Sequence, residues 1–258
     1  MVEAFAVASG KGGTGKTTST LALGMALAAE YDVTVVDADM GMANLLFHAG
    51  LAEVETTLHD VLVAGEGSAP VEAAVYERYG MSIVPCGTSL ADFAAADPTR
   101  LREVVARLAA DTDVLLLDSA ATLSSRAAVL PIVLADRVVV VLEPTIPSLS
   151  DGLKVQEYAR SYDTGTAGIL FNKVRDDDAI DAIASKAERY FEGPTLASVP
   201  ASDVVREARR AGQPLLDHAP DSTAAGAYRE AARALSVRDR DSATVADRFR
   251  SAVVPESL

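Results

Sequence analysis

Short runs of aliphatic and β-branched residues alternate along this chain with longer stretches in which apolar residues recur at helical spacing. Two of the runs, at residues 114–117 and 138–142, are apolar throughout, which is typical of strands buried on both faces of a sheet. The alternation predicts an α/β architecture of three layers. Its centre is a mostly parallel, twisted sheet of about seven or eight strands with helices on both faces.

The predicted elements follow from these patterns. Strands are expected at about residues 4–9, 33–37, 81–85, 114–118, 137–142, 168–172 and 195–199. Helices are expected at about residues 15–29, 98–110, 124–135, 148–160, 178–190, 202–211 and 222–235.

The chain changes character after residue 235. Residues 236–241 are charged and linker-like, and Val245, Phe249 and Val253 follow on one helix face. We therefore predict a domain at residues 1–235, followed by a linker and a short C-terminal amphipathic segment at residues 236–258. That segment is either a membrane-surface helix, or a terminal helix packed on the domain or a frayed tail. The membrane-surface helix is disfavoured, since such helices carry larger apolar residues and more Lys and Arg on their polar face.

Composition narrows the class of protein. A chain of 258 residues can form one large domain, and no run approaches the length of a membrane span. The sequence opens directly into a predicted strand, so no signal peptide is expected. The single cysteine, Cys86, excludes a disulfide framework. We expect a cytoplasmic protein, either throughout the cytoplasm or peripheral at the inner face of the membrane.

The formal net charge of −14 is strongly acidic, and only 5 of the 23 basic residues are lysine. Such a composition suggests a salt-adapted cell. It also opposes nucleic-acid binding, which depends on neutralising phosphates with Lys and Arg. Arg206, Arg209 and Arg210 cluster on one predicted helix, and a solvated helix face is the favoured interpretation.

The loop after the first predicted strand carries the strongest chemical signal. Gly10, Gly15, Lys16 and Thr17 satisfy the pattern G-x-x-x-x-G-K-[ST] between a strand and a helix. Glycines allow main-chain N–H groups to turn toward phosphate oxygens, and the helix N-terminus adds partial positive charge. Lys16 would reach the β- and γ-phosphates, and Thr17 would bind Mg²⁺. This pattern predicts a P-loop NTPase fold.

A dinucleotide-binding loop is the competing interpretation. Gly10, Gly12 and Gly15 also satisfy G-x-G-x-x-G, and Asp37 follows at a suitable distance. The Lys16–Thr17 pair favours the triphosphate, because a dinucleotide loop needs neither a lysine nor a hydroxyl there.

Carboxylates end two of the predicted strands. Asp118 stands where a carboxylate could hold a water on Mg²⁺, and Asp37 and Asp39 could orient the attacking water or touch the metal shell.

Lys11 adds a second lysine to the loop. With it, residues 11–17 resemble the deviant Walker A motif of the MinD/ParA class of P-loop ATPases at every defined position. The resemblance extends to about residue 235. Residues 37–45 are similar to that family's switch I segment, and residues 57–62 and 85–90 resemble MinD-like archaeal members. Asn172 matches the family's adenine-contacting asparagine, and Val199 and Pro200 begin a segment that flanks the adenine pocket.

The resemblance implies an ATPase that uses ATP and Mg²⁺. Lys11, Lys16 and Asp39 would serve hydrolysis, with Asp39 positioning the water and Lys11 acting across a subunit interface. Thr17 would ligate Mg²⁺, and Asp118 would hold the metal through water. The implied nucleotide-binding residues are Gly10, Lys11, Gly12, Gly13, Thr14, Gly15, Lys16, Thr17, Thr18, Asn172, Val199 and Pro200.

The family's mode of action would follow. ATP would promote a homodimer, a protein partner or activator would stimulate slow hydrolysis, and the cycle would position a division site or another large assembly.

One departure from the family pattern leaves alternatives open. After Asp118 the family has a proline and a glycine in switch II, whereas this chain has Ser119, Ala120, Ala121 and Thr122. A nucleotide-gated scaffold with little hydrolysis is therefore one alternative, and a ParA-like DNA-partitioning ATPase is another. An iron–sulfur carrier is disfavoured because one cysteine cannot supply paired thiolates.

Overall fold

A computed structural model describes residues 2–51, 53–65, 67–123, 125–175 and 179–253. Its centre is a sheet of 8 strands in the order β3-β4-β2-β5-β1-β6-β7-β8. Neighbouring strands are parallel except for the antiparallel β3–β4 pair. The strands are β1 (Glu3–Ala8), β2 (Val33–Asp37), β3 (Tyr76–Arg78), β4 (Met81–Val84), β5 (Val114–Asp118), β6 (Arg137–Leu142), β7 (Gly165–Val174) and β8 (Thr195–Pro200). The predicted mostly parallel α/β sheet is confirmed.

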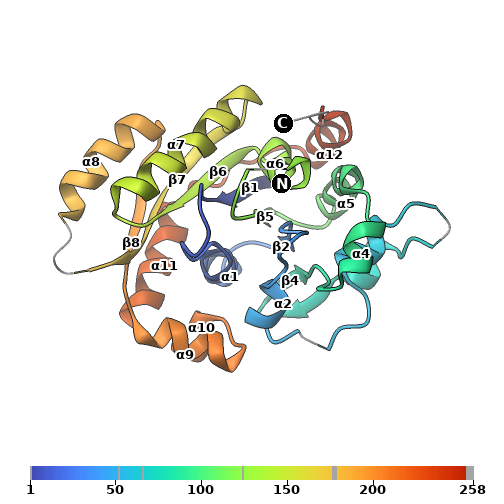
Figure 1. Cartoon of the computed structure of the whole chain (residues 1–258), viewed down its shortest axis with the longest axis horizontal. Helices are drawn as coiled ribbons and strands as arrows, with labels where there is room; N and C mark the ends of the chain where they lie inside the picture. Colours follow the sequence, from blue (N-terminus) through green and yellow to red (C-terminus); the bar gives the residue numbers. More distant parts are fainter. Residues whose placement is uncertain (1, 52, 66, 124, 176–178, 254–258) are drawn as a thin grey trace.

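Helices cover both faces of the sheet. They are α1 (Lys16–Leu27), α2 (Leu45–His48), α3 (Leu58–Leu62), α4 (Leu90–Ala95), α5 (Leu101–Leu108), α6 (Arg126–Leu134), α7 (Ile146–Ser161), α8 (Ile180–Phe191), α9 (Asp203–Ala211), α10 (Leu215–His218), α11 (Thr223–Ala234) and α12 (Ser242–Ser251). Two 3-10 helices, η1 (Val71–Ala74) and η2 (Pro98–Arg100), complete the described elements. Figure 1 shows α1, α9, α10 and α11 on one side of the sheet and α5, α6, α7, α8 and α12 on the other.

Period-2 alternation along the strands distributes side chains between the two faces. In β1, Phe5 and Val7 enter the core beneath α1 and α11, whereas Ala4 enters the core beneath α5 and α12. The small alanines alternating with larger residues explain why this strand is buried along its whole length.

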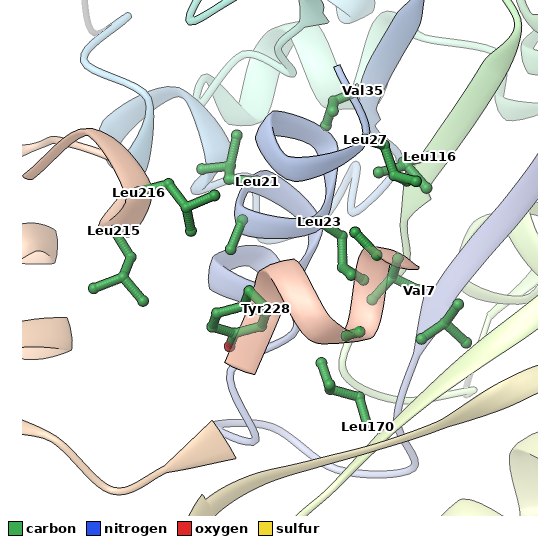
Figure 2. Close-up of a cluster of buried hydrophobic side chains, with 14 of the residues drawn as sticks. Val7, Leu21, Leu23, Leu27, Val35, Leu116, Leu170, Leu215, Leu216 and Tyr228 are labelled. Atoms are coloured by element: carbon green, nitrogen blue, oxygen red, sulfur yellow. The ribbon is translucent and has the colours of Figure 1, made fainter. Parts of the chain in front are cut away.

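Helix α1 lies unusually close to the sheet. A Cβ added at Gly24 would lie 2.9 Å from Cγ2 of Val35, so only glycine fits there. On its other side α1 meets α11, where the Tyr228 hydroxyl lies 3.0 Å from Oγ of Ser19. Figure 2 shows Tyr228 against α1, with Leu21 and Leu23 of that helix nearby. The helix that follows the phosphate loop is therefore fixed from both sides.

Every predicted strand and long helix is present, with ends shifted by up to a few residues. Ser9 and Pro85 fall just outside strands, and Gly15 caps α1 rather than beginning it. Strand β7 is longer at both ends than predicted. Strand β3, the 3-10 helix η1 and the short helices α2, α3, α4 and α10 were not predicted, and η2 forms the first turn of the helix predicted at residues 98–110.

The C-terminal segment packs on the domain. Val245 and Phe249 of α12 are buried in the core shared with α5. Val253 is 79% exposed and lies beyond the end of α12, so it does not share the helix face predicted for it. The division of the chain at residue 235 remains a prediction. Among the described residues, no helix combines the length and apolar character needed to cross a membrane.

Candidate nucleotide-binding site

The phosphate loop, residues 9–18, leaves the carboxyl end of the central strand β1 and enters α1. Gly13 and Gly15 have φ of 80° and 95°, a region that favours glycine. A Cβ at Gly10 would collide with the main chain of Asp151, and one at Gly15 would collide with the side-chain amide of Asn172. Three of the predicted glycines are therefore required by the backbone or by close neighbours.

Side chains brace the loop from within and from β7. Thr14 donates to the Ser9 hydroxyl at 2.9 Å, and Ser9 donates to the main-chain oxygen of Lys11 at 2.8 Å. Asn172 donates through Nδ2 to the main-chain oxygen of Thr14 at 2.7 Å, and Lys173 donates to that of Gly13. These bonds fix the course of the loop main chain around its glycines.

The first turn of α1 presents its main-chain N–H groups to the loop. Gly15, at the N-cap, has no side chain to cap them, and no acidic residue stands in the first turn. Lys16 is 7% exposed, and burial lowers the pKa of its ammonium group while Asp118 and Asp39 raise it. The combination of N–H groups and a buried lysine suits the binding of an anion.

Asp118 lies at the carboxyl end of β5, next to β1 in the sheet. Its carboxylate accepts hydrogen bonds from Thr20, at 2.9 Å, and from the Thr17 hydroxyl. Burial raises the pKa of Asp118 to about 6, against the opposing effects of these bonds and of Lys16. Thr17 and Asp118 thus bring together oxygen donors of the kind that Mg²⁺ prefers, so the residues fit the metal.

Asp37 and Asp39 differ in environment. Asp37 pairs in register with Asp118 and accepts from the main-chain N–H of Leu45 at 3.3 Å, which makes it a cap for α2. Burial and the charges of Asp118 and Asp39 raise its pKa well above the usual range. Asp39 is half-buried, and burial raises its pKa while the N–H of Met42 and the charge of Lys16 lower it. Asp39 is the more accessible carboxylate beside Lys16.

Lys11 points away from the buried carboxylates. Its Nζ lies 3.4 Å from Oε2 of Glu143, while Lys173 lies 2.7 Å from Oε1 of the same residue. Burial raises the pKa of Glu143, but the hydrogen bonds and charges of the two lysines outweigh it and leave that pKa below the usual value. Glu143 was missed by sequence reasoning, although it directly follows the apolar strand β6.

A groove of about 570 Å³ opens beside the loop. Its size is in the range of small-molecule sites. Asn172 and Pro200 line it, whereas the Val199 side chain is fully buried in the core, so any contact of Val199 with a base would come through its main chain. The groove is also lined by four basic residues, none of which was predicted to bind the nucleotide: Lys173, Arg175, Arg206 and Arg209. Part of the arginine face of α9 therefore borders this groove.

Thr18 also lines the groove, whereas Gly12 does not. A Cβ at Gly12 would lie 3.6 Å from Cβ of Ala121, so the segment after Asp118 faces the loop. Thr122, which replaces the family's glycine, is exposed. The structure thus brings the predicted residues together along one edge of the sheet, from the end of β2 to the end of β8.

The fold and this loop define a P-loop NTPase. The family model described as the CobQ/CobB/MinD/ParA nucleotide binding domain matches residues 5–215. An uncharacterised ATP-binding protein of Methanocaldococcus jannaschii is 38% identical over 237 residues, which cover 91% of this chain and 88% of the relative.

Solved structures agree. The septum site-determining protein MinD of Pyrococcus horikoshii, complexed with Mg-ADP, superposes with a TM-score of 0.80 at 32% identity and covers 90% of this chain and 95% of its own. The cell division ATPase MinD of Pyrococcus furiosus gives 0.82 at 32% identity, with 91% and 98% covered. The chain belongs to the CobQ/CobB/MinD/ParA family.

Proposed function

We propose that this protein is an ATPase of the MinD/ParA type, which binds ATP with Mg²⁺, dimerises on ATP and hydrolyses it slowly. One observation carries the proposal. A single loop holds a buried lysine, Lys16, beside Asp39 and Asp118, and a second lysine, Lys11, that is 36% exposed at its outer side. A lone nucleotide site needs the first lysine, whereas the second, which pairs with Glu143 at 3.4 Å, is the proposed contact with a partner's nucleotide.

In this proposal each group has a defined task. The loop N–H groups and Lys16 bind the β- and γ-phosphates, and Asn172 and Pro200 border the base. Thr17 holds Mg²⁺, and Asp118 holds it through water; the metal neutralises phosphate charge. Asp39 orients the attacking water, since it is the accessible carboxylate beside Lys16.

Exposed apolar side chains support a homodimer formed through this face. Met42, Leu90, Phe93 and Ile146 all follow the carboxyl ends of strands, on the edge where the phosphate loop lies. Their exposures are 74%, 80%, 38% and 82%. Apolar side chains gathered around a functional edge are typical of an interaction surface, so a second copy of the chain is the proposed partner.

The biological task is proposed from the relatives. The two Pyrococcus relatives are a septum site-determining protein MinD and a cell division ATPase MinD. We therefore propose that the ATP cycle acts from the cytoplasm to position a division site or another large assembly, with a protein activator that stimulates hydrolysis.

Phosphate release and light scattering, measured with MgATP at high salt, test the proposal. The Lys16→Ala variant should lose nucleotide binding. The Asp39→Ala variant should bind ATP, accumulate as a dimer and release little phosphate. The Lys11→Ala variant should bind ATP without dimerising. If the wild-type protein releases phosphate no faster than the Asp39→Ala variant, the proposed ATP hydrolysis is refuted. If the folded protein gives no heat of binding with MgATP, the proposed nucleotide-binding site is refuted.

A nucleotide-gated scaffold is the second candidate, and the segment around Thr122 favours it. Because Thr122 carries a Cβ, its main chain adopts the conformations open to glycine less readily. The Thr122→Gly variant should therefore hydrolyse ATP several-fold faster than wild type, with unchanged nucleotide affinity. Equal rates in a single-turnover phosphate assay would show that this segment does not limit hydrolysis.

A ParA-like role on DNA is the third candidate. Arg206 and Arg209, which border the base groove, are its only support in the described residues, and the net charge of −14 opposes it. A salt-dependent shift of non-specific DNA in a gel assay would favour it.

A further inference from the structure

A buried histidine contacts the loop that carries Asp39. His59, in α3, is 1% exposed, and its imidazole Nε2 lies 3.1 Å from the main-chain oxygen of Met40. A carbonyl oxygen can only accept, so Nε2 carries a hydrogen and donates it. The ring therefore ties α3 to the residue that follows Asp39.

The imidazole is held from several sides. The start of α3 is fixed by a capping box in which the main-chain N–H of Thr57 donates to Asp60 at 2.8 Å. The Phe93 ring lies 6.0 Å from the imidazole, centroid to centroid. On the remaining side stands Gly87, where an added Cβ would lie 3.2 Å from Nδ1. The absence of a side chain at Gly87 leaves the space that the ring occupies.

The protonation state follows from these surroundings. Nδ1 is buried and has no hydrogen-bond partner among the described residues. Burial lowers the pKa of His59, while the bond to Met40 and the charges of Asp92 and Asp60 raise it. The neutral ring with its hydrogen on Nε2 satisfies the contact that the fold provides.

The Met40 side chain is buried in the core and Asn44 donates to the main-chain oxygen of Met42 at 3.2 Å, but in the described residues few other hydrogen bonds reach the turn of residues 39–42 from outside it. The N–H of Met42 donates to both the main-chain oxygen of Asp39, at 3.3 Å, and its carboxylate, at 3.2 Å. These bonds lie within the turn and would move with it. The N–H of Asp39 donates to Asp37 at 3.2 Å, which fixes the start of the turn. His59 fixes the next residue from a separate helix.

We propose that His59 is a positioning residue for hydrolysis. Its Nε2–H bond to the Met40 carbonyl sets the place of the turn, so that the Asp39 carboxylate faces the water that attacks ATP. This rests on the proposed function, in which Asp39 orients that water. His59 touches neither nucleotide nor water and acts through the loop.

Two substitutions of similar polarity separate this role from simple packing. The amide nitrogen of Gln can occupy the place of Nε2, whereas that of Asn lies nearer Nδ1. The His59→Gln variant should keep at least half of the wild-type kcat. The His59→Asn variant should lose about tenfold in kcat, the worth of one buried hydrogen bond, with KM for MgATP changed less than twofold.

Controls come from the same chain. The Gly87→Ala variant keeps the imidazole but crowds both Nδ1, at 3.2 Å, and the Thr57 hydroxyl that begins α3, at 3.0 Å, and it should lower kcat in the same direction as His59→Asn. His218, which contacts Gln213 at 2.9 Å, supplies a control in His218→Asn, which should leave kcat unchanged. If His59→Asn fails to fold, Gly87→Ala carries the test.

Hydrogen exchange of residues 39–44, measured without nucleotide, separates failure of this role from failure of the proposed function. His59→Asn should speed exchange there at least fivefold, and His59→Gln should not. If the wild type is active, equal kcat for His59→Gln and His59→Asn would overturn the positioning role. Equal exchange rates of residues 39–44 in these two variants would overturn it as well. A wild type without turnover, in which exchange still separates the variants, would overturn the proposed function and support the anchoring of the loop.

Discussion

Single atoms decide whether the phosphate loop can form. Gly15 has φ of 95°, and a Cβ there would collide with the Asn172 amide that braces the loop. The Gly15→Ala variant should therefore lose at least a hundredfold in affinity for MgADP and melt at a lower temperature. Gly226 is the matched control, since it lies in α11 with open space around it. Calorimetric titration and thermal unfolding measure both effects.

For Gly226→Ala we expect unchanged affinity and a gain of about 1 kcal/mol in the free energy of unfolding, because alanine favours a helix more than glycine does. Wild-type affinity in Gly15→Ala would show that the loop can form with a side chain at this position.

Asp118 should make the free energy of unfolding of the nucleotide-free protein depend on pH. Its folded pKa of about 6 lies above the usual 3.8. A carboxyl group with a raised folded pKa stabilises the fold at low pH, and this contribution is lost as pH rises through the folded value. The Asp118→Asn variant should therefore match wild type near pH 4. Above pH 7 it should be more stable by about 3 kcal/mol, at about 1.4 kcal/mol per pKa unit.

Urea unfolding at a series of pH values, without nucleotide, measures this difference. Asp217→Asn, which changes an exposed carboxylate of α10, is the control. If the stability difference between Asp118→Asn and wild type does not grow between pH 4 and pH 7, ionisation of Asp118 does not destabilise the fold.

Sequence predicted the site residues that stand close together in the chain or at the ends of predicted strands, and a family resemblance added Asn172. Gly15, Lys16 and Thr17 stand side by side in the chain, so their spacing alone specifies a cradle. Glu143 and Lys173 could not be predicted, because Glu143 meets Lys11 and Lys173 only after β6 pairs with β1 on one side and β7 on the other. The same holds for His59, whose bond to Met40 crosses 19 residues of chain.

Among the helices and strands, the sequence likewise predicts the long buried elements and misses the short ones. Strands β2, β5 and β6 lie at their predicted bounds because they are mostly apolar and buried along their whole length. Strand β3 consists of Tyr76, Glu77 and Arg78, with two exposed charges, and pairs only at the sheet edge. Helices of four to six residues, such as α2 and α4, are too short to show a helical period.

Helix α12 shows why the C-terminal segment could not be resolved by pattern alone. Its amphipathic face fitted both a packed helix and a membrane-surface helix. The partners that decide between them are distant: Asp136 pairs with Arg240 at 3.0 Å and Arg248 at 3.1 Å, and the N–H of Arg238 donates to Glu3 at 2.6 Å. These contacts clamp the segment to the amino ends of β1 and β6.

The packing of α12 predicts a large difference between two apolar residues. Phe249 is fully buried, so Phe249→Ala should lower the free energy of unfolding by about 3–5 kcal/mol. Val253→Ala, at an exposed position on the same predicted face, should change it by less than about 0.5 kcal/mol. Urea denaturation measures both. Near-equal losses of unfolding free energy in the two variants would mean that α12 does not pack on the domain in solution. A membrane-surface role for its apolar face would then be favoured, and binding of the wild-type protein to anionic vesicles would test it.

The whole molecule separates its tasks between the two edges of the sheet. The carboxyl edge carries the phosphate loop, the aspartates, the groove lined by Asn172 and Pro200, and the exposed apolar side chains. The amino edge carries the buried Glu3–Arg137 pair, at 2.7 Å, and the clamp on the C-terminal segment. A partner can therefore engage the nucleotide edge without disturbing the contacts that hold the chain ends, which suits a protein that cycles between monomer and dimer.

Net charge should set the salt concentration at which the proposed dimer forms. Each copy carries a formal charge of −14, so joining two copies face to face opposes like charges. Salt shortens the range of this repulsion from about 10 Å at 0.1 M to about 3 Å at 1 M, while leaving apolar contacts in place. The fraction of MgATP-bound dimer should therefore rise at least several-fold between 0.1 and 1 M KCl, as measured by light scattering. The Asp39→Ala variant, expected to retain ATP, isolates association from turnover and should show the same rise. A dimer that dissociates as salt increases would mean that ion pairs, rather than the apolar side chains around the loop, hold the two copies together.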